Sequence, residues 1–262
     1  LAAGDPGAGG WLTRAEAALA PGGALHALSL DAVASAAIAG PARFGAWAPG
    51  APILDTFASH LGALYEDAPQ LRSMLALAER TERMARSAAG GPPEPVLAVK
   101  ARALGRMFSR DDGPTVGFLS AGGFDTHQHQ GGARGQLADR LEELDAALAA
   151  LREGAGPAWA RTVAIVFTEF GRTVAVNGSG GTDHGVASTA FVLGGAVRAG
   201  GLIGDWPTLA EGKLYQDRDV APGADLYALF IGVLAEHWGL SPRQLAAVFP
   251  GSAPRPLTGL VA

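Results

Sequence analysis

Residues 115–130 read TVGFLSAGGFDTHQHQ, an apolar run followed by two glycines and a series of polar side chains. The apolar part, Val116–Leu119, has the length expected of a short buried strand. Glycines let the chain leave a strand at backbone angles that other residues avoid. Asp125 and His127 are therefore expected at the strand's end, where open α/β sheets keep their ligand crevice, and together they suit zinc or a similar divalent ion. Taken alone, the motif is more typical of a polar loop that caps a helix.

A second acidic loop follows the β-branched apolar segment Thr162–Phe167. It reads TEFGR and carries Glu169 and Arg172. The arginine could hold an oxyanion in a bidentate fork. An arginine beside a glutamate is as often only its ion-pair partner, so both interpretations stay open.

A third loop, residues 177–185, reads NGSGGTDHG and contains Asp183 and His184. Another apolar run, Thr189–Leu193, follows it. The backbone amides of such a glycine-rich loop could cradle a phosphate, but this loop has no Walker lysine. Three acid- or histidine-bearing loops beside three candidate strands are the strongest functional signal in the chain.

Together the loops offer a set of candidate metal ligands, Asp125, His127, Glu169, Asp183 and His184. Such a cluster could polarise an ester oxygen and lower the pKa of a bound water or hydroxyl nucleophile. The alternative is that the carboxylates bind loop backbone while the histidines pack as polar linkers. Because the loops occur in series, we favour the metal cluster. A serine-hydrolase triad is disfavoured, since Ser120 lacks a G-x-S-x-G setting.

Hydrophobic periodicity and turn residues indicate a chain of alternating helices and strands. Predicted helices cover Trp11–Leu19, Ile53–Tyr65, Pro69–Ser87, Val96–Phe108, Leu137–Leu151, Leu226–Trp238 (capped by Asp225) and a short segment opening at Ser241-Pro242. Predicted strands are Ala24–Leu30, Val116–Leu119, Thr162–Phe167 and Thr189–Leu193, and segment 40–52, rich in proline and glycine, is predicted as loop. Strand–helix–strand order over 115–193 predicts parallel pairing through a right-handed crossover.

Composition excludes several classes of function. The chain of 262 residues has 25 acidic and 20 basic residues, a formal net charge of −5, and no basic block, so we expect no nucleic-acid partner. No stretch approaches the ~18 consecutive apolar residues of a membrane helix, so we expect no membrane span. Cysteine is absent, which excludes disulfides and thiolate metal sites.

The motifs resemble those of a known family. GGFDTHQHQ, TEFGRTVAVNGSGGTDHG, GGAVRAGG and GDWP are similar to segments of the bacterial "domain of unknown function 1501" family. The resemblance is specific over Phe118–Trp206 and continues more loosely to the C-terminus and back to Gly10–Arg14. The family is placed near the alkaline-phosphatase and sulfatase superfamily.

This resemblance implies an α/β fold, a three-layer sandwich with a mainly parallel central sheet like that of alkaline phosphatase. We expect a single domain over 1–262, with 1–114 mostly helical and 115–262 forming the sheet core that bears the motifs. In the superfamily, metal ligands lie on loops at the carboxyl ends of the strands. Asp125 and His127 match one ligand pair, Glu169 matches an acidic ligand, and His184 matches a late histidine with Asp183 beside it. Arg172 and Asn177 would face the anion.

The activity implied is metal-dependent hydrolysis of a phosphate or sulfate ester of a small molecule or saccharide. Zinc is the first choice of metal, with manganese, magnesium or calcium as alternatives. Family members are usually exported by a twin-arginine signal, which implies a periplasmic or extracytoplasmic location. The family's opening strand, with a further Asp ligand and the nucleophile region, has no counterpart before GWLTR, so we expect a fragment whose nucleophile lies upstream. The alternative function is a non-catalytic extracytoplasmic binding protein with a structural or ligand-holding metal site.

Overall fold

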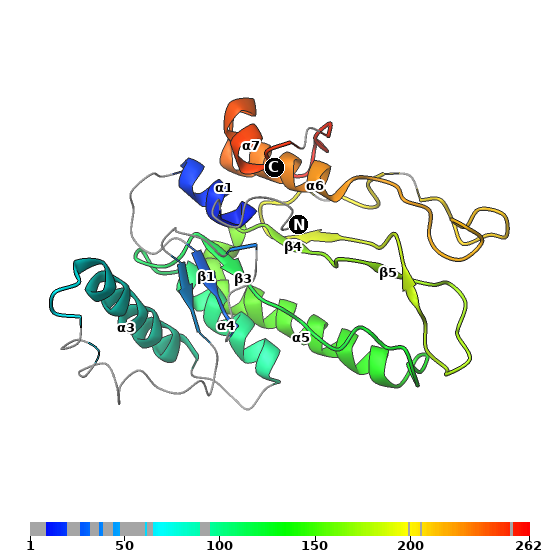
Figure 1. Cartoon of the computed structure of the whole chain (residues 1–262), viewed down its shortest axis with the longest axis horizontal. Helices are drawn as coiled ribbons and strands as arrows, with labels where there is room; N and C mark the ends of the chain where they lie inside the picture. Colours follow the sequence, from blue (N-terminus) through cyan, green and yellow to red (C-terminus); the bar gives the residue numbers. More distant parts are fainter. Residues whose placement is uncertain are drawn as a thin grey trace. The chain divides into compact units, whose positions relative to one another are not determined.

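The computed structural model of the chain describes residues 9–19, 27–31, 37–38, 44–47, 61, 65–89, 95–198, 200–204, 206–251 and 254–262. It contains two compact units, Leu1–Ala121 with Asp145–Ala158, and Gly122–Leu144 with Trp159–Ala262. Each unit mixes helices with small sheets (Figure 1), which confirms the mixed α/β class. The predicted helix Ile53–Tyr65 lies largely outside the described residues. The division into a single domain with a boundary at 114/115 stays a prediction.

The first unit holds a parallel sheet of three short strands in the order β2-β1-β3. These are β1 (Ala27–Ser29), β2 (Phe44–Ala46) and β3 (Val116–Phe118). The predicted strands at β1 and β3 are confirmed, whereas the prediction that 40–52 is all loop is wrong. The prolines and glycines around β2 led to the loop prediction. Its three residues form a strand because they pair with β1, not because of their own strand propensity.

Asp31, two residues after the end of β1, connects the elements at the carboxyl end of this sheet. The carboxylate of Asp31 accepts a hydrogen bond from the Ser120 backbone N–H at 3.0 Å and pairs with Lys100 at 2.9 Å. Both side chains of the Lys100–Asp31 pair are largely buried. Water and salt screen such a pair less than they screen a surface pair, so the attraction between the charges is stronger. Asp31 thereby connects β1 and β3 with the helix that carries Lys100.

The helices of the first unit follow the predicted pattern. They are α1 (Trp11–Leu19), α3 (Pro69–Ala89), α4 (Val96–Phe108) and the later turns of α5 (Gln136–Ala155). Helices α4 and α5 approach closely at two glycines. A Cβ on Gly105 would lie 2.4 Å from the Leu151 carbonyl oxygen, and one on Gly154 would lie 2.3 Å from the Arg102 carbonyl oxygen. Glycine is therefore required at both positions of this crossing.

The second unit contains two antiparallel pairs of strands. β4 (Ala164–Val166) pairs with β7 (Phe191–Leu193), and β5 (Gly171–Arg172) pairs with β6 (His184–Gly185). Strands β4 and β7 were predicted, whereas β5 and β6 lie in segments predicted as loops. The parallel arrangement predicted for β4 and β7 is wrong. A parallel pair needs a crossover, usually helical. The chain from β4 to β7 has no helix and folds back through the β5–β6 ladder instead, so β7 returns antiparallel.

A hydrophobic core in the second unit lies between the β4–β7 pair and α6 (Leu226–Trp238). Its buried members are Leu229, Val233, Leu260 and Val261, against which Val163, Ile165 and Val192 pack. The predicted caps are confirmed. The Asp225 side chain accepts from the Tyr227 N–H, and Ser241 with Gln244 forms a capping box at α7 (Pro242–Val248). None of the helices in the described ranges has the length and hydropathy required to cross a bilayer.

The last described segment of the chain is held by one carboxylate of α6. Glu236 accepts hydrogen bonds from the backbone N–H groups of Gly259 at 2.6 Å, Leu260 at 2.8 Å and Val261 at 2.9 Å. Desolvation acts to raise the pKa of Glu236, but these three hydrogen bonds outweigh it and hold the pKa below its ordinary value. The charged carboxylate therefore stabilises the fold.

We expect Glu236→Gln to lower the free energy of unfolding by about 1–2 kcal/mol at neutral pH, a value discounted for the exposure of the carboxylate. Because the folded-state pKa is lowered, the stabilisation is present above the ordinary pKa of about 4.3 and is lost as pH falls through the folded value. Urea denaturation as a function of pH measures this, with the exposed Glu211→Gln as the control. An equal deficit at neutral and acidic pH would contradict the assignment.

Candidate metal centre

Three ligand-type side chains converge in the second unit. Asp125, His127 and His184 each offer one atom, and these atoms lie within 4.8 Å of one another. Oδ1 of Asp125 lies 2.9 Å from His127 Nε2 and 2.8 Å from His184 Nε2. Each side chain is roughly half exposed, so solvent reaches all of them. Residues from the first and third motifs therefore meet in one cluster, as the sequence predicts.

Backbone pairing between the two loops brings these motifs together. Gln128 forms an isolated antiparallel bridge with Gly180, and the Thr182 N–H donates to the Thr126 carbonyl at 3.2 Å. The chain enters the first loop through Gly123, whose φ of +88° is one that glycine adopts without strain. The ligand atoms are thus positioned by a two-sided backbone ladder rather than by a single loop.

Asn177 organises the glycine-rich loop. Its side-chain amide donates to the His127 carbonyl and to Asp183 Oδ1, both at 3.0 Å. Its carbonyl oxygen accepts from the backbone N–H groups of Ser179 at 2.9 Å and Gly181 at 3.1 Å. An asparagine side chain has two donors and two lone pairs, so all four are used. These contacts give Asn177 a positioning role, and its predicted contact with an anion stays a prediction.

Arg172, on β5, bonds to Asp125 of the cluster and to Thr182 of the glycine-rich loop. Its Nη1 donates to Asp125 Oδ1, its Nε donates to the Thr182 hydroxyl at 3.0 Å, and its Nη2 donates to the Thr182 carbonyl. The guanidinium is largely shielded from solvent. Its observed role is to orient Asp125, and two of its five N–H donors are not used by these bonds. The predicted contact with a bound anion stays a prediction.

Asp183 contacts the cluster from outside. Its Oδ1 lies 3.4 Å from His127 Nδ1, the ring nitrogen that faces away from Asp125. Hydrogen bonds from Asn177 first and from His127 second hold the pKa of Asp183 below its ordinary value. A carboxylate on the second nitrogen of a histidine is the usual support of a metal-binding imidazole. Asp183 is therefore placed to orient His127.

Glu169 is not brought into the three-residue group. It lies in a bend between β4 and β5, is exposed, and makes no hydrogen bond or ion pair with another described residue. The neighbouring Phe170 does reach the cluster, because its ring stacks on His184 with centroids 4.1 Å apart. The second motif thus contributes an aromatic support and Arg172, while a ligand role for Glu169 stays a prediction.

The charge state of Asp125 suits a cation ligand. Partial desolvation acts to raise its pKa, but hydrogen bonds from His184 and Arg172, with the charge of His127, hold it below the ordinary value. Asp125 is therefore ionised at neutral pH. It provides an anionic oxygen beside two imidazole nitrogens, a donor set that zinc accepts readily.

The observed distances allow such an ion after a small adjustment. A tetrahedral zinc ion with bonds of about 2.0–2.2 Å keeps its ligand atoms roughly 3.3 Å apart. The two separations at Asp125 Oδ1 are about half an ångström shorter than this, and all three ligand atoms lie within 4.8 Å of one another. Side chains this exposed can rotate by that amount, so the residues fit a three-ligand metal site.

Three polar residues that connect the ligand-bearing loops were not predicted from the sequence. The hydroxyls of Thr126 and Thr182, both buried, donate to the same Gln130 side-chain oxygen at 2.7 and 2.8 Å. Each threonine directly neighbours a ligand-type residue in the sequence, which is the signal that could have identified it. Through Gln130 the two threonines join the two loops.

Asp219, also missed, supports β6 from a distant part of the chain. It is fully buried, and its carboxylate accepts from the Val186 N–H at 2.5 Å and lies 3.4 Å from Arg218 Nε. Its backbone bridges to Thr173. Because Val186 follows His184 by two residues, this carboxylate holds the strand that presents His184. No motif marks it in the sequence, since a lone Asp in a turn is ordinary.

The close approach of the two loops requires a glycine at position 181, which can be tested. A Cβ on Gly181 would lie 2.3 Å from the carbonyl carbon of His127, too close for any side chain. We expect Gly181→Ala to move the His127 backbone, to lower the free energy of unfolding by about 1–3 kcal/mol and to weaken metal binding. Gly178→Ala is the matched control, because a Cβ there meets nothing within 4 Å. Chemical denaturation and calorimetric titration with zinc measure both, and equal behaviour of the two variants would refute this packing.

Comparison with known proteins assigns a family to the chain. The family model described as "Protein of unknown function (DUF1501)" matches residues 38–249, which include all three ligand-bearing loops. No curated protein and no solved structure matches the chain. The match covers most of the sequence and agrees with the resemblance of its motifs. The chain therefore belongs to the DUF1501 family.

Proposed function

We propose that Asp125, His127 and His184 bind a divalent metal ion, zinc in the first place, and that this ion serves the hydrolysis of a phosphate or sulfate ester. The observation that carries the proposal is the geometry of the cluster. Asp125 Oδ1 and two imidazole nitrogens converge while His127 Nδ1 faces a second carboxylate, Asp183. Three protein ligands leave one position open for water or substrate, the arrangement of catalytic rather than structural zinc sites.

The protein's own groups have distinct roles in this proposal. Asp125 and the two histidines hold the ion, which would lower the pKa of a bound water or hydroxyl and polarise the ester. Asp183 orients His127, and Arg172 orients Asp125. The remaining N–H donors of Arg172 are available to an ester oxygen. Glu169 is proposed as a further ligand of the loaded state, in addition to the position left open for water or substrate.

The finer fold assignment is also a proposal. We propose a three-layer arrangement related to the alkaline-phosphatase superfamily, which the parallel β2-β1-β3 sheet supports. The antiparallel β4–β7 and β5–β6 pairs would then be additions to that arrangement. An extracytoplasmic location and a small-molecule or saccharide ester as substrate are proposed from the family resemblance alone.

One observation favours the alternative function, a non-catalytic binding protein that keeps the metal site. The hydroxyls closest in sequence to the ligands belong to Thr126 and Thr182, which are buried and hydrogen-bonded to Gln130. Neither is free to act as a nucleophile. Catalysis by the described residues would therefore require a metal-bound water, whereas binding requires no nucleophile.

Metal addition tests the proposal. Free metal at ~100 times its dissociation constant should stabilise the fold by about 2.7 kcal/mol, which raises the melting temperature by roughly 5–10 °C. Thermal denaturation with zinc, manganese, magnesium, calcium and a chelator measures this. A melting temperature indifferent to all of them would refute the metal site. Turnover of an aryl phosphate and an aryl sulfate by the metal-loaded protein then separates the enzyme from the binding protein.

A further inference from the structure

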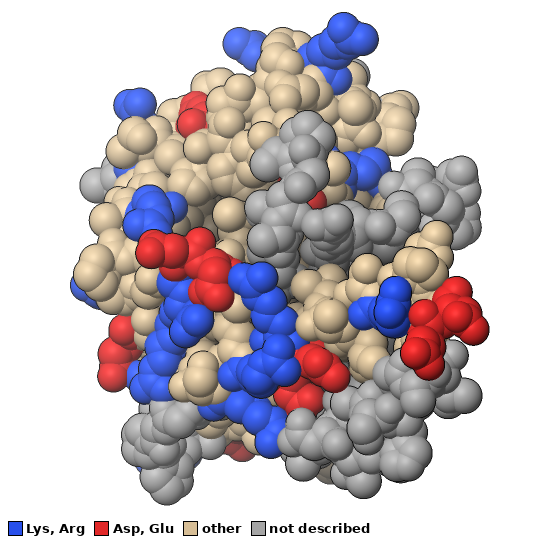
Figure 2. Space-filling view, turned by 90° about the vertical axis from the view of Figure 1, so that its left-hand side faces the viewer, with Lys and Arg blue, Asp and Glu red and all other residues tan. Residues whose placement is uncertain are grey.

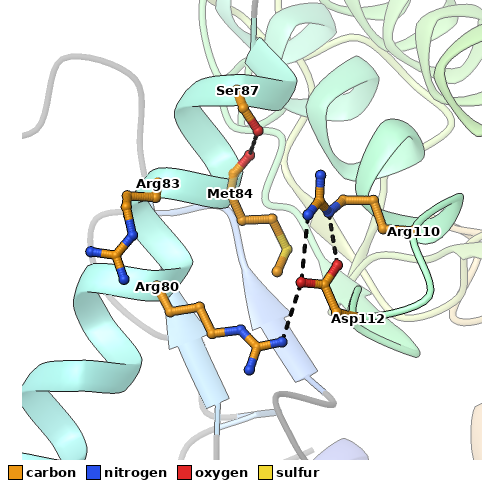
Figure 3. A pocket seen from close by; sticks show the side chains of 6 residues that line it. All are labelled: Arg80, Arg83, Met84, Ser87, Arg110 and Asp112. Atoms are coloured by element: carbon orange, nitrogen blue, oxygen red, sulfur yellow. Dashed lines mark hydrogen bonds and ion pairs between the residues drawn. The ribbon is translucent and has the colours of Figure 1, made fainter.

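A second polar site lies in the first unit, away from any motif. The helix α3 and the turn that follows α4 border a half-open cavity of about 220 Å³. It is lined by Arg80, Arg83, Met84, Ser87, Arg110 and Asp112 (Figure 3). The α3 residues recur at helical spacing, so they form one stripe of the helix. All six residues belong to the same compact unit, and the cavity is therefore independent of how the two units are arranged.

The cavity is strongly cationic in a chain whose formal net charge is −5. Arg80 and Arg110 contact the single carboxylate, Asp112, while Arg83 lies at the rim and points away from it (Figure 3), so the lining carries a formal charge of +2. Figure 2 shows the side of the molecule on which α3 lies, where Lys and Arg side chains gather with Asp and Glu between them. An excess of positive charge around a hollow raises the local concentration of anions.

The bonds to Asp112 use only some of the N–H donors of Arg80 and Arg110. Arg80 reaches it through Nη2 alone, at 3.3 Å, and Arg110 reaches it through Nε at 2.9 Å and Nη2 at 3.5 Å. A guanidinium has five N–H donors, so both arginines keep donors that these bonds do not use. Arg83 lies 3.8 Å from Glu79, beyond hydrogen-bond distance, and is mostly exposed.

We propose that this cavity binds the dianionic phosphate group of a small molecule. Planar guanidinium forks match the oxygens of phosphate bidentately. A phosphate monoester carries a charge of about −1.5 to −2 at neutral pH, which balances the charge of the lining. The ligand accepts hydrogen bonds from Arg80 and Arg110, Arg83 adds positive charge at the rim, and the side chain of Met84 provides an apolar wall.

Calorimetric titration of the full chain with inorganic phosphate tests this assignment. A chelator and constant ionic strength are used, so that a metal at Asp125 and general screening do not contribute. We expect Arg83→Gln to weaken phosphate binding about fivefold, a moderate effect for an exposed charge. Arg72→Gln, an exposed arginine on the same helix with the same charge change, should bind as the wild type does.

A second variant changes affinity in the opposite direction. Asp112→Asn removes the carboxylate that competes for Arg80 and Arg110, so it should tighten phosphate binding about fivefold or more. Weakened binding in Asp112→Asn, equal losses in the Arg83 and Arg72 variants, or no heat with phosphate would each overturn the proposal. Acetate at the same concentration should bind more weakly than phosphate, and equal affinity for both would exclude a dianion site. Sulfate binding equal to phosphate is expected, since the two share charge and shape.

Discussion

Replacing Asp125 with alanine is expected to lower the affinity of the chain for zinc by more than about 100-fold. Loss of an outer partner of a metal ligand already costs about 10–100-fold, and Asp125 is a ligand whose oxygen also contacts both histidines. Two imidazoles alone, with no anionic oxygen between them, retain little of the site's charge complementarity. Calorimetric titration with zinc, together with the metal-induced shift in melting temperature, measures the loss.

Two further variants are needed to interpret this result. Asp145→Ala removes an exposed carboxylate from α5 and should leave zinc affinity unchanged. Glu169→Ala separates the ligand set predicted from sequence from the three-residue cluster. A large loss in Glu169→Ala would show that the loop of Glu169 closes onto the ion. Unchanged zinc affinity in Asp125→Ala would refute the metal centre.

Asp219→Ala is expected to destabilise the chain by about 3 kcal/mol, one of the largest losses available to a single side chain. The change leaves the Val186 N–H without its acceptor, and it opens a cavity at the fully buried position of Asp219. The strand that presents His184 then loses its support. We expect zinc affinity to fall about tenfold as well, since Asp219 acts through that strand.

The conservative variant distinguishes support of the site from general stability. Asp219→Asn keeps the shape and one acceptor oxygen, so it should recover most of the zinc affinity while remaining somewhat less stable than the wild type. Glu211→Ala, which removes an exposed carboxylate a few residues away, serves as the control. Urea denaturation and zinc titration are both needed. Wild-type zinc affinity in Asp219→Ala, measured well below its melting temperature, would exclude the supporting role.

Helices were predictable from the sequence because their signals are local. Helix α4 and helix α6 have the predicted bounds, since each combines an apolar repeat with a clear stop or cap. Proline at the first position of α7 and the Ser241 cap are likewise read directly from neighbouring residues. Strand pairing was not predictable in the same way. Strands of three residues carry too little pattern to specify a partner, and the partners of β4 and β2 are far away in the sequence.

The site was predictable in its ligand types but not in its membership. The first and third motifs were identified by residue type, and their convergence depends on the ladder between residues 128 and 180, which no periodicity reveals. Glu169 was chosen by the same reasoning and lies outside the cluster, because its bend is placed by β5 and not by that ladder. Asp219 escaped notice for the converse reason. Its role depends on its burial, and the burial of a single acidic residue cannot be recognised from the sequence.

The four hydrogen bonds of Asn177 have a consequence for how this family can vary. Surface loops rich in glycine and serine usually tolerate insertions and deletions. Here one side chain reaches Ser179 and Gly181 in one direction and His127 and Asp183 in the other. An inserted or deleted residue between Asn177 and Asp183 would separate these contacts even if its composition were unchanged. Relatives should therefore exchange the exposed residues of this loop freely while retaining its length, so that the spacing of the loop, more than its composition, identifies chains that keep the same site.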